Sequence, residues 1–159
     1  MKAISFVGYS NSGKTQIICQ LLEWFSAQDV RVAVIKHSHK TGLGDEHKDT
    51  GRFRRAGARM VALAAPGVLQ VTQTISKDPP LSEVLTLLAP QVDVILVEGY
   101  KSSFLPKVAV LGPESVEVPD FPKIIALVAS QPPVTSLPVF HPQAVEALGK
   151  FLRQFLGFP

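Results

Sequence analysis

Apolar residues follow two alternating patterns along the chain. Short, nearly continuous apolar runs are typical of strands that are buried on both faces. Such runs occupy residues 3–7, 31–35, 92–97, 107–111 and 123–129. Between the first two runs, apolar residues recur at helical spacing from Ile17 to Phe25, which predicts an amphipathic helix over residues 16–26. This strand–helix–strand succession predicts a βαβ unit with a right-handed crossover.

The remaining segments continue the alternation of strands and helices. We expect further strands at 60–64 and 68–72, and helices at 50–59, at 81–88 and from Pro142, as first helical residue, to Leu156. Segments rich in proline and glycine at 77–80, 112–122 and 131–138 indicate surface loops. The pattern predicts a three-layer α/β fold around a mostly parallel sheet. Since no repeat or long linker divides the chain, we expect one domain over residues 1–159.

Composition narrows the class of protein. The chain has 159 residues, of which 46% are hydrophobic and 18% charged, which excludes intrinsic disorder. No apolar run approaches the ~18 residues of a membrane span, so we expect a soluble, cytoplasmic protein without a membrane partner. The single cysteine, Cys19, excludes an internal disulfide and a cysteine-cluster metal site.

The net charge of +3 is too small to imply nucleic acid, and we expect no nucleic-acid partner. The distribution of charge is more informative, because basic residues crowd one segment. These are Lys36, Lys40, Lys48, Arg52, Arg54, Arg55 and Arg59, opposed by Asp45, Glu46 and Asp49. The segment is either a solvated helix face or a surface that meets the phosphates of a nucleotide or of a phosphorylated ligand on a partner.

The strongest chemical signal is the sequence GYSNSGKT at residues 8–15, which matches the phosphate-loop pattern G-x-x-x-x-G-K-[ST] at every fixed position. Glycines let the backbone wrap closely around an anion, and the following helix N-terminus adds partial positive charge. We expect Lys14 to reach the β- and γ-phosphates and Thr15 to supply a hydroxyl to Mg²⁺. The expected nucleotide contacts are Gly8, Asn11, Ser12, Gly13, Lys14, Thr15, Gln16 and Lys36. With this motif, the expected fold is a P-loop NTPase fold, with one nucleotide-binding domain over residues 1–159. The alternative is a plain glycine turn with an exposed lysine.

A second signal is the apolar strand that ends at Glu98, followed by Gly99. In P-loop proteins, a carboxylate at the end of such a strand lies beside the phosphates, where it binds Mg²⁺ or positions a nucleophile. Glu98 and Lys14 are therefore the candidate catalytic residues, and Asp93 is expected at the far end of the same strand. The alternative is that Glu98 is an exposed acid that closes a strand.

Histidines and an aspartate follow the second predicted strand. His37 and His39 alternate and so point to one side, but the chain offers few further soft ligands, and polar contacts to a phosphate or partner are favoured over zinc. Asp49 is a candidate Mg²⁺ or water ligand, and a cap for the helix at 50–59 is an equal alternative.

Taken together, these segments closely resemble the molybdopterin-guanine dinucleotide biosynthesis protein B family. The resemblance rests on residues 1–15, RVAVIKHSH at 31–39, KDT at 48–50, RRAGA at 54–58, LVEGYK at 96–101 and Pro106-Lys107. It covers nearly the whole chain in order.

The resemblance implies a P-loop protein that binds GTP and Mg²⁺ and hydrolyses GTP slowly at most. It implies that the protein assists the molybdenum cofactor guanylyltransferase, which joins GMP to molybdopterin, with a phosphorylated pterin as a further ligand. It also implies a homodimer. The implied Mg²⁺ ligands are Thr15, Glu98 and Asp49, and Lys36, Arg54 and Arg55 would face phosphates or the partner.

Two departures keep other functions open. The guanine-reading N-K-x-D motif is absent, and Ser130-Gln131 stands where the family leads us to expect an aspartate. No residue therefore excludes ATP, and a small-molecule kinase, with Arg52, Arg54 and Arg55 as a phosphoryl clamp, is the alternative function. A partitioning or metal-inserting ATPase fits less well, because Tyr9 stands where many such proteins have a second lysine.

Overall fold

The computed structural model describes residues 1–38 and 42–158, which form two compact units. The first comprises residues 1–37 and 81–159, and the second comprises residues 38–80. The expectation of one nucleotide-binding domain over the whole chain stays a prediction.

The first unit is built on a six-stranded sheet with the order β2-β5-β1-β6-β7-β8. Its strands are β1 (Ala3–Val7), β2 (Val32–Lys36), β5 (Val94–Glu98), β6 (Lys107–Val110), β7 (Ile124–Val128) and β8 (Val139–Phe140). All neighbouring strands pair in parallel. The carboxyl ends of the strands therefore lie at one edge of the sheet, where ligands bind in open α/β folds.

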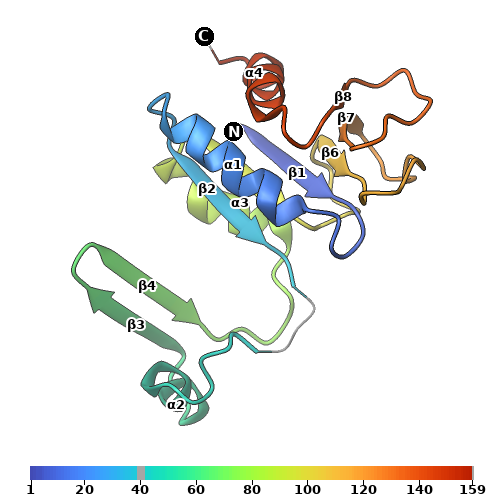
Figure 1. The fold of residues 1–159 in the computed structure, drawn as a ribbon. Coiled ribbons are helices and arrows are strands. Elements are labelled where there is room, and N and C mark those ends of the chain that lie inside the picture. Colours follow the sequence, from blue (N-terminus) through green and yellow to red (C-terminus); the bar gives the residue numbers. More distant parts are fainter. Residues whose placement is uncertain (39–41, 159) are drawn as a thin grey trace. The chain divides into compact units, whose positions relative to one another are not determined.

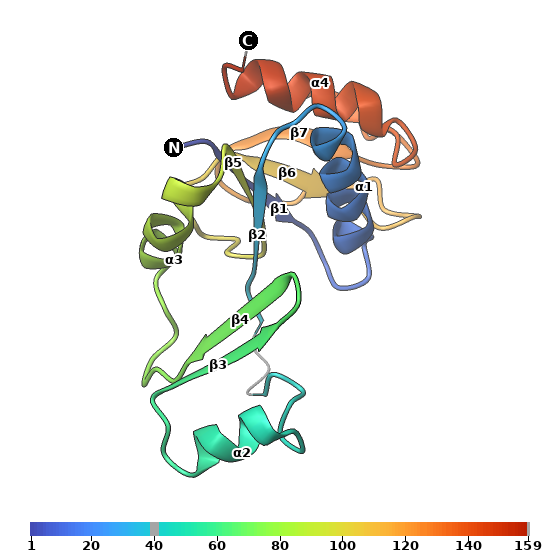
Figure 2. The same cartoon turned by 90° about the vertical axis from the view of Figure 1, so that its left-hand side faces the viewer.

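Helices cover both faces of this sheet, as Figure 2 shows. One face carries α1 (Lys14–Ser26) and α4 (Val145–Phe155), which pack on β1, β5, β6 and β7. The other face carries α3 (Leu81–Leu88), followed by the 3₁₀ turn η1 (Ala89–Gln91). This confirms the predicted three-layer α/β fold with a parallel sheet.

The core explains why the apolar runs form strands. The side chains of Phe6, Leu21 and Phe25 are completely buried between the sheet and α1. Burial of one such side chain contributes roughly 1.5–3 kcal/mol. The sheet and α1 thus form a rigid support for the loop that joins them.

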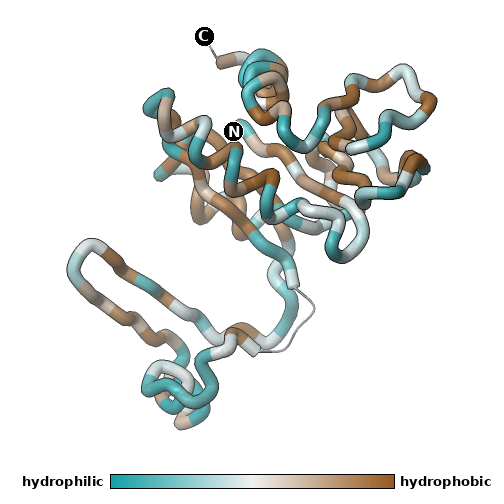
Figure 3. Tube along the Cα trace, viewed as in Figure 1, coloured by the Kyte–Doolittle hydropathy of each residue, from teal (hydrophilic) through white to brown (hydrophobic). Residues whose placement is uncertain are grey.

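The second unit consists of α2 (Asp49–Arg55) and an antiparallel hairpin of β3 (Met60–Ala65) and β4 (Val68–Gln73), visible in Figure 1. Both strands were predicted. The register pairs Ala65 with Val68, so two residues turn the hairpin, and Gly67 there adopts a φ of 75°. Figure 3 shows apolar residues along both strands. The large apolar side chains exposed on the hairpin are Met60, Leu63, Val68, Leu69 and Val71.

Three details differ from the expectations. The last helix begins at Val145 and not at Pro142, because Ala144 has a non-helical backbone (φ −88°, ψ 47°) and is the N-cap. The helix expected over 50–59 ends at Arg55, shortly before Gly57 with its φ of 106°. Strand β8 was missed, because two residues are too short to show a period.

Asp93 lies at the amino end of β5, as predicted. Its carboxylate accepts hydrogen bonds from the guanidinium and the backbone N–H of Arg31, which lower the pKa of Asp93 to about 2. These contacts hold the start of β5 against the start of β2.

Among the described residues, no helix combines the length and apolarity that a membrane crossing requires.

Candidate functional site

The glycine-rich loop, residues 8–13, joins β1 to α1 at the carboxyl edge of the sheet. Gly8 has a φ of 150°, and a Cβ there would lie only 2.3 Å from the carbonyl oxygen of Val110 on β6. Asn11 and Gly13 also have positive φ, 61° and 92°, and Gly13 is the N-cap of α1. The loop is therefore a tight backbone turn that ends at a helix N-terminus, as the motif predicts.

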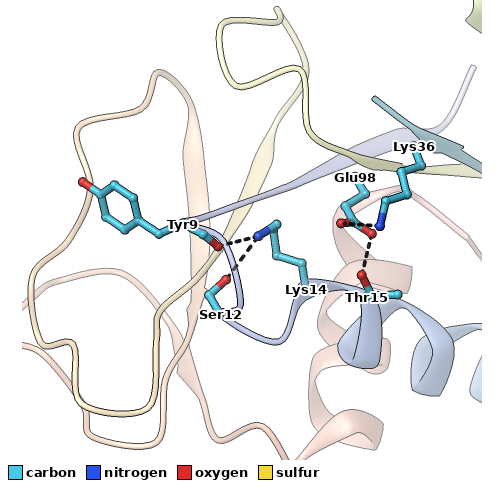
Figure 4. Close-up of polar contacts among 6 residues, drawn as sticks. All are labelled: Tyr9, Ser12, Lys14, Thr15, Lys36 and Glu98. Carbon is cyan, nitrogen blue, oxygen red and sulfur yellow. Dashed lines mark hydrogen bonds and ion pairs between the residues drawn. The ribbon is translucent and has the colours of Figure 1, made fainter. Parts of the chain in front are cut away.

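Lys14 folds back onto this loop, as Figure 4 shows. Its Nζ donates to the carbonyl oxygen of Tyr9 at 2.6 Å and to Oγ of Ser12 at 3.4 Å. Burial lowers the pKa of the Lys14 ammonium, Glu98 opposes that shift, and the positive charges of Lys101 and Lys36 add to it. The ammonium is thus held against neutral acceptors and close to two other cations.

Glu98 lies at the end of β5, beside both the first helical turn and β2 (Figure 4). Its Oε2 accepts a hydrogen bond of 2.9 Å from Oγ1 of Thr15, and its Oε1 pairs with Nζ of Lys36 at 3.1 Å. The Glu98 side chain is 13% exposed, whereas that of Lys36 is 58% exposed. Glu98 is therefore no exposed acid at a strand end, and three of the predicted site residues meet in one cluster.

A sharp turn follows Glu98. Gly99 (φ 103°) donates its N–H to the Phe6 carbonyl at 3.2 Å and accepts a 2.7 Å hydrogen bond from Oγ of Ser5. The next residue, Tyr100, has a φ of 49° and stacks on His37 with ring centroids 4.2 Å apart. A side chain at Gly99 would lie 3.0 Å from Cβ of His37, so the turn requires glycine. His37 thus makes an aromatic contact beside the site.

Sequence reasoning missed three residues that shape this edge. Ser5 and Tyr100 position the turn after Glu98, and Lys101 lies with its Nζ 5.6 Å from the ring centroids of both Tyr9 and Phe121. Ser5 could have been found as the one hydroxyl inside an otherwise apolar strand. No local signal marks Lys101, because its neighbours come from distant parts of the chain.

The other residues predicted to contact the nucleotide or Mg²⁺ are exposed. Asn11 and Gln16 are exposed, and Gln16 lies in the first turn of α1. Asp49 belongs to the second unit, where its carboxylate is 3.5 Å from NH1 of Arg52 and its side chain is 81% exposed. The alternative that Asp49 caps α2 is wrong, since Lys48 is the N-cap. The metal-binding role of Asp49 stays a prediction.

The basic segment is in part structural, which corrects one expectation. Arg54 pairs with Asp45, which also accepts a hydrogen bond from Thr50, and Arg55 donates to the Glu46 carbonyl. The Arg54 side chain is only 22% exposed. Arg54 therefore stabilises the second unit and is not displayed for a phosphate, whereas Arg55 is exposed and its role toward a phosphate or partner stays a prediction. His39 and Lys40 lie outside the described residues.

A parallel sheet with a glycine-rich loop between its first strand and helix, and a carboxylate on the adjacent strand, defines a P-loop NTPase-like fold. Comparison with known proteins then gives the family. The sequence model of molybdopterin guanine dinucleotide synthesis protein B (MobB) matches residues 3–130, and the chain belongs to this family.

Related proteins match this chain over nearly its whole length. A probable molybdopterin-guanine dinucleotide biosynthesis adapter protein of Bacillus subtilis is 35% identical, with 97% of this chain and 93% of that protein covered. The adapter protein of Haemophilus influenzae is 32% identical, with 97% and 91% covered. The crystal structure of Bacillus subtilis MobB superposes with a TM-score of 0.80 at 31% identity, covering 97% of this chain and 98% of that one.

Proposed function

We propose that this protein is a GTP-binding adapter in the formation of the guanine dinucleotide of molybdopterin, and that it assists the guanylyltransferase. The observation that carries the proposal is the contact of Thr15 with Glu98 directly beside the glycine-rich loop. Family membership supplies the pathway, because the relatives are adapter proteins of that biosynthesis. A phosphorylated pterin is the further ligand of the assembly.

The loop offers a complete set of phosphate-binding groups. A triphosphate would exchange the Tyr9 carbonyl and the Ser12 hydroxyl for phosphate oxygens as partners of the Lys14 ammonium. Backbone N–H groups of the loop and the N-terminus of α1 add donors and partial positive charge. The positive φ of Gly8, Asn11 and Gly13 is the kind of backbone conformation in which successive N–H groups can form an anion-binding concavity.

Thr15 and Glu98 fit a Mg²⁺ site. Magnesium is commonly bound by one or two carboxylates together with substrate phosphates and waters, and a hydroxyl next to a carboxylate provides the protein's share. Bound Mg²⁺ would neutralise charge on the β- and γ-phosphates. Asp49 is proposed as a further ligand on the strength of the family resemblance alone.

Hydrolysis is proposed to be slow at most, with Lys14 and Glu98 as the groups at the reacting phosphates. Efficient GTPases orient the attacking water with a side chain such as glutamine. Here Gly99, Tyr100 and Lys101 follow Glu98, and the Tyr100 ring stacks on His37. An adapter needs nucleotide-dependent binding and not rapid turnover.

As the pH is raised, triphosphate affinity should begin to fall at a lower pH than it would if Lys14 had the usual lysine pKa. The lowered pKa of Lys14 means that its ammonium loses a proton below the usual lysine value of ~10.4, and phosphate binding restores that proton. Binding is therefore coupled to proton uptake as the pH rises through the pKa of the free protein. Calorimetry of triphosphate binding in buffers of different ionisation enthalpy, at pH values below the usual lysine pKa, should show this uptake.

We also propose a homodimer, in which the hairpin of β3 and β4 is the contact surface. Five large apolar side chains are exposed on it, among them Leu69 at 69%. An isolated two-stranded hairpin is marginally stable in water, and apolar surface of this kind gains from being covered. Analytical ultracentrifugation measures the oligomeric state: we expect a dimer for the chain and a weakened dimer for Leu69→Ser.

A titration with fluorescent GTP and ATP analogues, with and without Mg²⁺, tests the nucleotide proposal. The expected result is a Mg²⁺-dependent preference for GTP, followed by nucleotide-dependent binding to the guanylyltransferase in a pull-down. Equal or better ATP binding would contradict the GTP assignment and favour the small-molecule kinase. Of the three arginines that would clamp a phosphoryl group in such a kinase, Arg54 is largely buried and paired with Asp45, which disfavours this alternative.

A further inference from the structure

Both oxygens of the Glu98 carboxylate are already engaged in this structure. Thr15 donates to Oε2, and the ammonium of Lys36 lies 3.1 Å from Oε1. The Lys36 contact is built into the sheet, because Lys36 and Glu98 are register partners on the adjacent parallel strands β2 and β5. Lys36 therefore reaches the carboxylate of β5 that lies beside the glycine-rich loop, and its mostly exposed side chain leaves it free to move away.

We infer that Lys36 acts as a built-in substitute for the metal ion and competes with Mg²⁺ for Glu98. This inference rests on the proposed function, which places Mg²⁺ between Thr15, Glu98 and a triphosphate. An ammonium and a divalent cation cannot both lie against one largely buried carboxylate without strong repulsion. Arrival of Mg²⁺ must therefore release Lys36 from Oε1 and turn the Thr15 hydroxyl hydrogen away from Oε2.

The exchange has consequences for the nucleotide. While Lys36 is in place, Glu98 is neutralised, so it repels a triphosphate little even when Mg²⁺ is absent. Once Mg²⁺ has displaced it, the ammonium is free to bind phosphate oxygens, which attract cations strongly. Lys36 is thus a specificity-determining residue that sets how far nucleotide binding depends on the metal ion.

The test compares the chain with Lys36→Gln, which removes the charge and keeps a polar side chain. Lys150→Gln is the matched control, because Lys150 is a lysine on α4 that pairs with Glu146 at 2.6 Å. A fluorescent triphosphate analogue is titrated with Mg²⁺, and separately bound in EDTA. For Lys36→Gln, we expect the half-saturating Mg²⁺ concentration to fall about tenfold, the size of one charge-assisted hydrogen bond. We also expect weaker binding in EDTA.

An unchanged Mg²⁺ midpoint in Lys36→Gln, or an equal shift in Lys150→Gln, would overturn the inference. Failure of the proposed function looks different, since then no variant would bind a triphosphate at all. In that case, the competition between Lys36 and a metal ion is tested without nucleotide. Electron paramagnetic resonance measures Mn²⁺ binding to the nucleotide-free protein. Tighter Mn²⁺ binding by Lys36→Gln than by the parent, lost again in Lys36→Gln/Glu98→Gln, supports competition. Equal binding by both, or none by either, contradicts it.

Discussion

Replacing Lys14 by alanine is expected to weaken triphosphate binding by about 100-fold or more. The Lys14 ammonium donates hydrogen bonds to the glycine-rich loop itself, at the Tyr9 carbonyl and the Ser12 hydroxyl. Hydrogen bonds from a charged donor to phosphate are about twice as strong as neutral ones. Titration with a fluorescent triphosphate analogue measures the loss.

The same substitution should leave the free energy of unfolding nearly unchanged. Lys14 packs no apolar surface into the core, and its lowered pKa shows that burying the ammonium is a cost to the folded state. Lys150→Ala removes an equal charge from α4 and is the control for long-range electrostatics. Undiminished affinity in Lys14→Ala would contradict the assignment of residues 8–15 as a phosphate site.

Gly8→Ala is expected to destabilise the fold by about 3 kcal/mol or more and to abolish triphosphate binding as well. The added Cβ would lie 2.3 Å from the carbonyl oxygen of Val110, far inside van der Waals contact, and a φ of 150° is itself strained for alanine. Val110 is the last residue of β6, which pairs with β1 and β7. The Val110 backbone therefore cannot move away without loss of sheet hydrogen bonds.

Gly13→Ala provides the comparison. Gly13 also has a positive φ, 92°, but an added Cβ would meet no atom within 4 Å. The cost should be that of the backbone conformation alone, about 1–2 kcal/mol. Urea unfolding of both variants measures the difference. Equal destabilisation would show that the clash at Gly8 is relieved by movement of the loop.

The elements of the parallel sheet could be predicted because each is recorded locally in the sequence. An apolar run such as 94–97 is buried throughout, so its residues carry the signal without help from neighbours. The signal for the glycine-rich loop is equally local, since its glycines, Lys14 and Thr15 lie close together in the chain. Even Glu98 was found from its place at the end of a strand.

What could not be predicted depends on the strand order. Lys36 meets Glu98 only because β5 lies between β2 and β1, and no local pattern reveals that order. The salt bridge of Arg54 with Asp45 likewise depends on how the chain folds between them. A proline was taken for a helix start at 142, where the backbone of Ala144 postpones the helix to Val145.

The strand order also leaves β2 at one border of the sheet and the two-residue β8 at the other. An unpaired strand offers backbone donors and acceptors to any extended peptide, and natural sheets guard against such templated aggregation with short edges and charges. Here Arg31 precedes the five residues of β2, and Lys36 ends them. The charge of Lys36 therefore also opposes edge-to-edge aggregation, and an apolar residue in its place would lengthen the aggregation-prone part of the β2 edge.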